Sequence, residues 1–228
     1  MARIDTNLAS ESTLLSALSP QVRDCLMGRA RYRTLSSGET LSLQGEPAQA
    51  LKIVVEGWVK LYKLSEDGHE AVLTTLGRGE SFDEVPAMMG GTCTHGAEAV
   101  SNCKIMLLDL SDICACTNAR AEISMAVITA TQTHLDRFTS QIESLKIKTA
   151  ACRLGEYLLG LVEQNGGARH VALPFGKVVL AGLLGIKPES LSRAFSRLKS
   201  VGVHSAMRDV RIEDPHALRS WTESQTAG

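Results

Sequence analysis

The sequence predicts an α+β protein in which a β-sandwich or jelly roll is followed by a long helix and a smaller helical domain. Three observations predict it. Short strand-like segments alternate with glycine turns as far as about residue 110, an uninterrupted heptad pattern follows, and two short helices meet at a glycine near residue 185. A chain of 228 residues can form two modest domains. We expect residues 1–118 to form the first domain, 119–148 the long helix, and 149–228 the second domain.

Composition and charge narrow the classes of protein. Hydrophobic residues make up 44% and charged residues 21% of the chain, a balance typical of folded proteins. No apolar segment approaches the ~18 residues of a membrane span, and the N-terminus lacks the apolar region of a secretory signal, so we expect a cytoplasmic protein with no membrane partner. Residues 1–146 carry a net charge of −5 and residues 147–228 carry +4, which favours an anionic partner for the second half.

The first domain is predicted from its turn residues and from the short apolar segments between them. A short helix over 12–30, broken or restarted at Ser19-Pro20, precedes it. Turn pairs such as Glu56-Gly57 and Asp67-Gly68 then separate short apolar segments, and residues 65–69 are typical of a hairpin. The strand-like segments are 51–55, 58–62, 71–76 and 104–108. Such spacing is typical of an all-β sandwich or jelly roll.

A long helix follows, without glycine or proline over residues 119–154. Apolar positions along it step alternately by three and four residues, which is a heptad repeat. The positions are Ile128, Thr131, Leu135, Phe138, Ile142 and Leu145. So narrow a stripe favours a matching helix in a second copy of the chain, and we therefore expect a homodimer. The alternative is a helix that packs on its own domain.

The segment 176–199 carries the strongest functional signal. After a helix over about 149–164 and a short strand near 170–174, it has the pattern of a helix-turn-helix: a small residue, Ala181, at the crossing, and Gly185 at the turn. Pro188 fits the first turn of the second helix. The buried face of that helix is predicted to consist of Leu191, Ala194, Phe195 and Leu198.

The opposite face of the second helix presents groups that suit double-stranded DNA. Arg193 can donate two hydrogen bonds to guanine, and Glu189 can accept one from cytosine. Ser192 can form a hydrogen bond with a base or contact a thymine methyl group. The expected phosphate contacts are Lys187, Arg197 and Lys199. Two short strands around residues 207–209 would add a wing. The alternative is a helical hairpin with a charged outer face.

Several motifs resemble the CRP/FNR superfamily of bacterial transcription regulators, and the likeness covers nearly the whole chain. In the first domain they are Gly38-Glu39 and the segments 44–47, 57–62 and 67–70; in the second, the segment 188–193 matches the E-x-x-S-R recognition helix of the FNR-type branch. The resemblance implies a cyclic-nucleotide-binding-like β-roll and a winged helix-turn-helix. It also implies that Glu189, Ser192 and Arg193 read a TTGAT-like inverted repeat, and that the protein activates transcription by RNA polymerase.

The sensory input departs from the best-known relatives. Cyclic-AMP receptors hold the cyclic phosphate with an Arg-Ser pair, but the matching segment here, 92–97, has no arginine. No cysteine precedes Cys25, so the cysteine cluster that holds an iron–sulfur centre is absent from that region. We therefore expect neither cyclic AMP nor an iron–sulfur cluster. The sequence is more similar to the branch without a cluster, which includes the nitric-oxide-responsive denitrification regulators (DNR/NNR-type) and FixK-like proteins.

That branch implies a response to nitric oxide or low oxygen, with haem b as the candidate cofactor. Haem needs an axial His, Met or Cys in an apolar pocket, and the candidate ligands are His69, His95, Met88 and Met89. For each, the alternative is a surface histidine or a methionine that fills a gap in the core. A FixK-like or thiol-redox regulator without haem is the second hypothesis, with Cys114, Cys116 and Cys152 as candidate thiols.

Two other classes of protein fit the sequence less well. A small-ligand-binding module without DNA function would leave the helix-turn-helix pattern unexplained. An enzyme would need a nucleophile beside a base, or a glycine loop around a phosphate, and the sequence has neither at recognisable spacing. We therefore expect a protein that is not an enzyme.

Overall fold

The computed structural model describes residues 6–110 and 117–225. The chain forms two compact units, Met1–Arg137 and Phe138–Gly228, and each is described by itself. Candidate thiols Cys114 and Cys116 lie outside the described residues. The two units divide within the long helix α5 (Thr117–Ile147), which runs without a break as the heptad pattern predicts.

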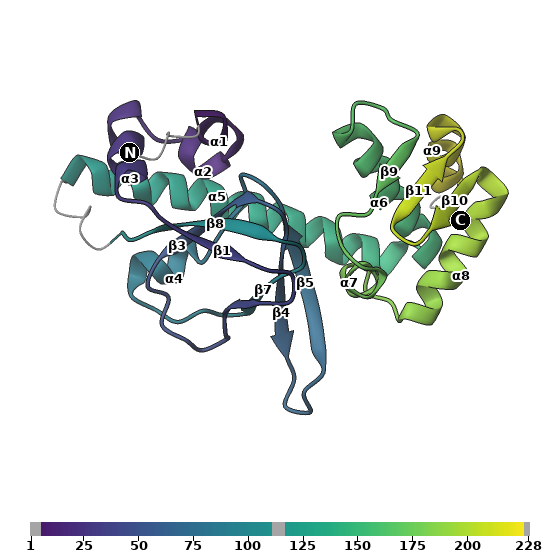
Figure 1. Ribbon diagram of the computed structural model, residues 1–228, viewed down its shortest axis with the longest axis horizontal. Helices are drawn as coiled ribbons and strands as arrows, with labels where there is room; N and C mark the ends of the chain where they lie inside the picture. Colours follow the sequence, from purple (N-terminus) through teal and green to yellow (C-terminus); the bar gives the residue numbers. More distant parts are fainter. Residues whose placement is uncertain (1–5, 111–116, 226–228) are drawn as a thin grey trace. The chain divides into compact units, whose positions relative to one another are not determined.

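The first unit is a sandwich of two four-stranded antiparallel sheets (Figure 1), which confirms the predicted fold class. One sheet has the order β1-β8-β3-β6, with β1 (Arg31–Leu35), β8 (Cys103–Leu108), β3 (Leu51–Glu56) and β6 (Ser81–Phe82). The other has the order β2-β7-β4-β5, with β2 (Thr40–Ser42), β7 (Gly96–Ala99), β4 (Val59–Leu64) and β5 (Glu70–Leu76). The predicted hairpin at residues 65–69 joins β4 to β5.

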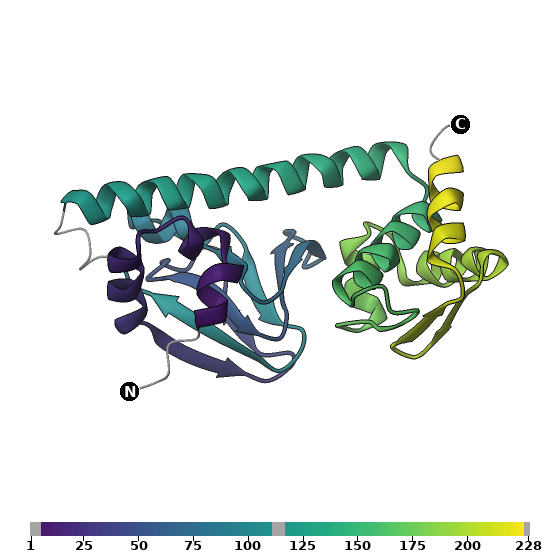
Figure 2. The ribbon, with the colours of Figure 1, turned by 90° about the horizontal axis from the view of Figure 1, so that it is seen from above.

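Two apolar layers hold this unit together. Side chains such as Val54, Phe82 and Ile105 fill the space between the sheets. On the other side of the first sheet, Ile53 and Met106 pack against helices. These helices are α1 (Thr6–Glu11), α2 (Thr13–Ser16), α3 (Pro20–Gly28) and the first half of α5. Figure 2 shows the purple helices and the beginning of α5 gathered on this face.

Local chemistry explains the helix boundaries. The Ser12 side chain accepts a hydrogen bond from the Leu15 backbone and begins α2, and Pro20 occupies the first turn of α3. The predicted helix over 12–30 is therefore two helices, divided at Ser19-Pro20. A further helix, α4 (Glu84–Met89), follows β6.

The second unit is a winged helix-turn-helix. Its helices are α6 (Ala150–Gln164), α7 (Lys177–Leu183), α8 (Pro188–Leu198), the 3-10 turn η2 (Lys199–Val201) and α9 (Pro215–Ser224). Its sheet has the order β10-β11-β9, with β10 (Val203–Ala206), β11 (Asp209–Ile212) and β9 (His170–Ala172). The predicted wing is confirmed, with Met207 and Arg208 between its two strands. Among the helices that the structure describes, none combines the length and the apolar character that a membrane crossing requires.

Candidate nucleic-acid interface

The turn between α7 and α8 has the backbone that its sequence favours. Gly185 has φ +62°, a conformation that side chains with a Cβ rarely adopt. Lys187 is extended, as expected for a residue before proline, and Pro188 begins α8. These residues fix where α8 starts and so which of its side chains point outward.

Helix α8 is divided into a buried and an exposed face. Its buried residues are Leu191, Ala194, Phe195 and Leu198, which confirms the predicted inner face. Glu189, Ser192 and Arg193 are all exposed in the first half of the helix. The structure thus places the three predicted base-reading residues on one outward surface, at the end of the helix that enters the major groove in this motif.

The serine hydroxyls of this surface bond to their own helix. Ser192 Oγ donates to the Pro188 carbonyl at 3.3 Å, and Ser196 Oγ donates to the Ser192 carbonyl at 3.0 Å. Serine hydroxyls in helices often bond in this way, and a change of χ1 rotamer releases them. The charged groups of Glu189 and Arg193 are therefore the more available partners on this surface.

The predicted phosphate-binding side chains surround this surface. Lys187, Arg197 and Lys199 are all exposed. Arg197 Nη2 also donates to Gln225 Oε1 at 3.4 Å, a contact that helps to hold its guanidinium group in place.

A hollow of about 180 Å³ beside α8 is a feature that sequence reasoning missed. Ser190, Arg193 and Arg197 line one side of it, and the first turn of α6, residues 149–151, lines the other. The first backbone N–H groups of a helix have no partner within the helix and carry a partial positive charge. The Arg197 guanidinium group and a helix N-terminus together suit a phosphate, while Arg193 borders the hollow from the reading surface. The signal is hard to see in the sequence because the two sides lie about forty residues apart.

Arg153 connects the helix-turn-helix to the end of α5. Its Nε donates to the Leu184 carbonyl at 3.0 Å, and its Nη1 donates to the Lys148 carbonyl at 2.6 Å. Both acceptors are carbonyls at helix ends, which lack partners inside their helices. Arg153 therefore fixes the turn before α8 against the chain that leaves α5.

Helix α5 has one face on its own domain and one heptad stripe in solvent. Ile123, Val127 and Ala130 are buried in the helix-side core of the first unit. Ile128 and Ile142 are 58% and 55% exposed, and Leu135 is exposed as well. Thr131 is exposed, Phe138 is half-buried, and Leu145 is 41% exposed. The helix therefore packs on its own sheet and leaves an apolar stripe in solvent, and pairing of that stripe with a second copy stays a prediction.

The face of α5 toward the sandwich carries an ion pair and a contact between a histidine and a carboxylate. Arg137 donates to a carboxylate oxygen of Glu80, and His134 Nε2 lies 3.0 Å from Glu84 Oε1. Ser81 Oγ donates to the same Glu84 oxygen at 2.5 Å. A hollow of only about 70 Å³ remains beside these residues. Arg137 therefore places an arginine beside Glu80, although it lies far along the chain from segment 92–97.

Glu84 is held in its charged form. Burial opposes ionisation of this carboxyl, but the hydrogen bonds from His134 and Ser81 outweigh it and hold the pKa of Glu84 below its ordinary value. The pair thus contributes to the link between α5 and the sandwich while Glu84 is ionised.

The four predicted haem ligands lie in different surroundings. His69 is exposed in the β4–β5 turn and Met89 is 74% exposed at the end of α4, so neither has the apolar surroundings that an axial ligand needs. Met88 packs against the helix-side core. His95 Nε2 lies 3.7 Å from Asp83 Oδ1, and burial lowers the pKa of His95. The described residues also contain no group of three or more metal-ligating side chains.

Of the predicted redox thiols, Cys152 is the one that the structure describes. It is fully buried in α6, and Thr149 Oγ1 donates to its sulfur at 3.2 Å. An oxidant would have little access to this thiol.

Comparison with known proteins matches both units. Residues 32–119 match the model of the cyclic nucleotide-binding domain, and residues 152–221 match that of the Crp-like helix-turn-helix domain. The nitrogen fixation regulation protein FixK of Azorhizobium caulinodans is 30% identical over 75% of this chain and 71% of its own. A CRP-like cAMP-activated global transcriptional regulator of Mycobacterium tuberculosis is 25% identical over 96% of both chains.

Solved structures agree in fold. A putative cAMP-binding regulatory protein of Silicibacter pomeroyi is 40% identical with a TM-score of 0.69, over 95% of this chain and 97% of that one. FixK2 of Bradyrhizobium japonicum shares the fold, with 24% identity and a TM-score of 0.73 over 84% of this chain and 96% of its own. These relatives are regulators and not enzymes. From the two matched domains, the outward surface of α8 and these relatives, the chain belongs to the CRP/FNR family of DNA-binding transcription regulators.

Proposed function

We propose that this protein is a homodimeric, sequence-specific regulator whose α8 helices read a TTGAT-like inverted repeat. The observation that carries the proposal is the exposure of Glu189, Ser192 and Arg193 on one surface of α8, above a fully packed inner face. Arg193 donates two hydrogen bonds to guanine O6 and N7, Glu189 accepts from cytosine N4, and Ser192 contacts the neighbouring base edge. Each good base contact discriminates against a wrong base by about 1–3 kcal/mol.

The phosphates on both sides of the reading surface fix the register of the helix. The hollow between α8 and the first turn of α6 takes one phosphate, with Arg197 and the helix N–H groups as donors. Lys187 and Lys199 add exposed charges. These contacts raise affinity for any sequence, because the phosphate backbone carries no sequence information.

An inverted repeat requires two reading helices related by twofold symmetry. The exposed stripe on α5, with Ile128 and Ile142 in it, supports pairing with the same helix of a second copy. Pairing of this kind places the two α8 helices on successive major grooves, about 34 Å apart.

The reading assignment is tested by fluorescence anisotropy on a panel of duplexes. The panel contains the inverted repeat and single changes at every half-site position. Arg193→Ala is expected to bind the intact site and the guanine-changed site equally, with discrimination at other positions kept. Ser200→Ala, an exposed hydroxyl beyond the end of α8, is the matched control and keeps the wild-type preferences. Equal loss of affinity for every duplex with Arg193→Ala would contradict the assignment.

From the contacts between α5 and the sandwich, we propose that cyclic AMP is not the effector. The proposal is supported by Glu80 and Glu84, which are already paired with Arg137 and His134, and by the small remaining space. An added anion would have to displace these pairs or lie beside carboxylates. Calorimetric titration with cyclic AMP is expected to give no saturable heat, and stoichiometric binding would refute the proposal.

A response to nitric oxide or low oxygen, and activation of RNA polymerase, stay predictions from the resemblance. The similarity to FixK gives limited support to the FixK-like alternative, and the surroundings of the four candidate ligands favour a mechanism without haem. An absorption spectrum of the anaerobic protein, with haem b and then nitric oxide added, tests this. A Soret band at one haem per chain would support haem sensing.

Activation of RNA polymerase is tested by in vitro transcription from a promoter that contains the inverted repeat.

A further inference from the structure

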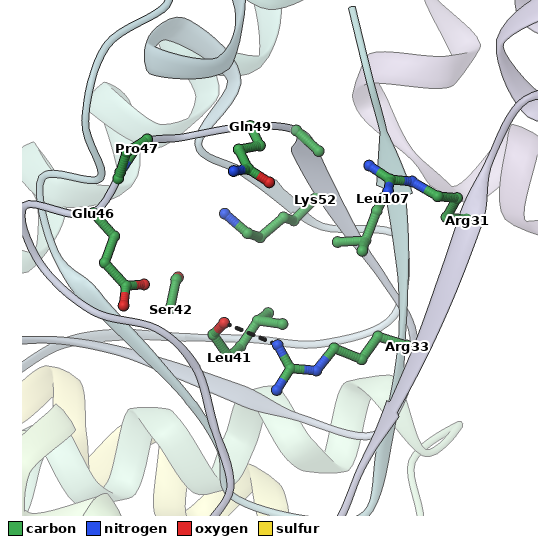
Figure 3. Close-up of a pocket in the computed structure, with 10 residues that line it drawn as sticks. Arg31, Arg33, Leu41, Ser42, Glu46, Pro47, Gln49, Lys52 and Leu107 are labelled. Atoms are coloured by element: carbon green, nitrogen blue, oxygen red, sulfur yellow. Dashed lines mark hydrogen bonds between the residues drawn. The ribbon is translucent and has the colours of Figure 1, made fainter.

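A second hollow in the first unit lies at an end of the sandwich and shares no lining residue with the one toward α5. Its volume is about 390 Å³, within the usual range of small-molecule sites. Strands β1, β3 and β8 form one wall, and β2 with the segment 46–50 forms the other (Figure 3).

Strand register gathers three cationic side chains on one wall. Leu107 of β8 pairs with Arg31 of β1 on one side and with Lys52 of β3 on the other, so these side chains point to the same face of the sheet. Arg33 lies two residues after Arg31 and therefore also points to this face. The arrangement is dictated by the backbone and does not depend on one rotamer.

The two arginines have charge to offer. Lys52 Nζ is paired with Asp83 Oδ2 at 2.5 Å, and the carboxylate balances its positive charge. Arg33 donates to the carbonyls of Leu41 and Thr40, at 3.2 and 3.3 Å, which orients its guanidinium group without cancelling its charge. Within residues 6–110 and 117–225, neither Arg31 nor Arg33 forms a salt bridge.

The opposite wall offers uncharged and acceptor groups. Ser42 is 7% exposed, and its Oγ has no hydrogen bond to nitrogen or oxygen; its polar neighbour is the thiol of Cys93. Glu46 Oε2 accepts from the Leu43 backbone at 2.8 Å, which leaves the other oxygen for a ligand. Figure 3 shows Gln49, Lys52 and Arg33 extending into the space between the walls.

This wall is held in place by backbone hydrogen bonds. Gly45 N donates to the Cys93 carbonyl at 2.8 Å, Cys93 N donates to the Glu46 carbonyl at 2.8 Å, and Ala48 N donates to the Gly91 carbonyl at 3.0 Å. The hollow is therefore preformed, and little ordering of the chain would be needed when a ligand binds.

We propose that this hollow binds a small organic phosphate, with Arg31 and Arg33 on the phosphate and Glu46, Gln49 and Ser42 on hydroxyl groups of the remainder. Two guanidinium groups about 7 Å apart along one strand can each donate a pair of hydrogen bonds to a phosphate dianion. A monocarboxylate has too few oxygens for both. The site is independent of DNA reading, which belongs to the other unit.

Isothermal titration calorimetry of the full chain tests this with glucose 6-phosphate, inorganic phosphate and glucose as probes. We expect saturable binding of glucose 6-phosphate, weaker binding of inorganic phosphate and none of glucose. Arg31→Gln with Arg33→Gln should weaken binding roughly tenfold or more, because charge-assisted hydrogen bonds are lost. Lys104→Gln is the matched control: Lys104 lies on the same sheet, its Nζ stacks on the Tyr32 ring, and its register position points to the other face.

Unchanged affinity in Lys104→Gln together with the loss in the double arginine variant supports the site. An equal loss in both would mean that net charge attracts the probe, and the proposal would fail. It would also fail if no phosphate bound at millimolar concentration, if inorganic phosphate bound as tightly as the ester, or if a glutamate-rich peptide bound there in place of the ester. Circular dichroism of each variant confirms that the fold is retained.

Discussion

The Leu145 side chain fills the space in front of Gly185: a Cβ on Gly185 would lie 2.6 Å from Leu145 Cδ2. Leu145 is the last position of the heptad stripe on α5, and Gly185 is the turn of the helix-turn-helix. The end of the proposed dimer helix and the turn before α8 are therefore in direct contact. A change in the packing of the stripe would therefore change the contact of Leu145 with the turn that orients α8.

Gly185→Ala is expected to lower the free energy of unfolding of the protein by about 1–3 kcal/mol, because alanine is strained at φ +62°. Displacement of Leu145 adds to the cost. Urea unfolding followed by circular dichroism measures the change. Gly160→Ala is the control, since no atom lies within 4 Å of its added Cβ and helix α6 favours alanine. That variant should gain about 0.5–1 kcal/mol, and a similar loss in both would argue against the role given to Gly185.

Lys199→Ala is expected to weaken binding to all duplexes to a similar degree, because the exposed lysine at the end of α8 is predicted to contact phosphate and not bases. The slope of log K against log salt should fall by about one unit. Arg219→Ala removes an equal charge from α9, where Arg219 pairs with Glu163, and should leave the slope unchanged. A change of base preference in Lys199→Ala would contradict its assignment.

Ile128→Glu combined with Ile142→Glu should convert the dimer to monomer. Each of these side chains contributes roughly 1.5–3 kcal/mol when it is fully buried, and each occurs twice in a symmetric pair. Sedimentation velocity should show the dissociation constant rising by about two orders of magnitude or more. Ser140→Glu, exposed on the side of α5 away from the stripe, should remain dimeric. A double variant that sediments like the wild type would place the interface elsewhere.

Glu84→Gln is expected to lose stability at neutral pH and to match the wild type in acid. The folded-state pKa of Glu84 lies below its ordinary value of 4.5, so its contribution is present above that value and is lost as the pH falls through the lower one. The difference in free energy of unfolding, about 1–2 kcal/mol at pH 7, should close below pH 4.5. Glu66→Gln, exposed in the β4–β5 turn, should show no such convergence. Parallel thermal melts measure both.

Local pattern was enough to predict most elements of the fold. Glycine turns marked the strands, because positive φ is confined largely to glycine, and the spacing of Leu191, Phe195 and Leu198 fixed the inner face of α8. Helix α4 was not predicted, because it is only six residues long and contains Pro86, a residue that disfavours the interior of a helix. The division at Ser19-Pro20 was visible, but α1 was not predicted, since its residues are mostly polar.

Features that depend on distant residues could not be predicted in the same way. Arg137 reaches Glu80 across 57 positions of the sequence, and Arg193 faces the first turn of α6. Neither relation leaves a local periodicity. Likewise, Arg31 and Lys52 become neighbours of Leu107 only through strand pairing. Cys152 was predicted as a redox thiol, but burial, which decides access, is set by the packing of the whole unit.

Because the Ser192 hydroxyl already donates to the Pro188 carbonyl, docking on a base exchanges one neutral hydrogen bond for another. Such an exchange adds little to the overall strength of the complex. Its effect is on the order of affinities among different sequences. A base edge that cannot accept a hydrogen bond leaves the serine bonded to Pro188, and a base edge that can accept one is preferred slightly. Affinity would then come from the cations, and fine selectivity from a side chain that has no charge at all.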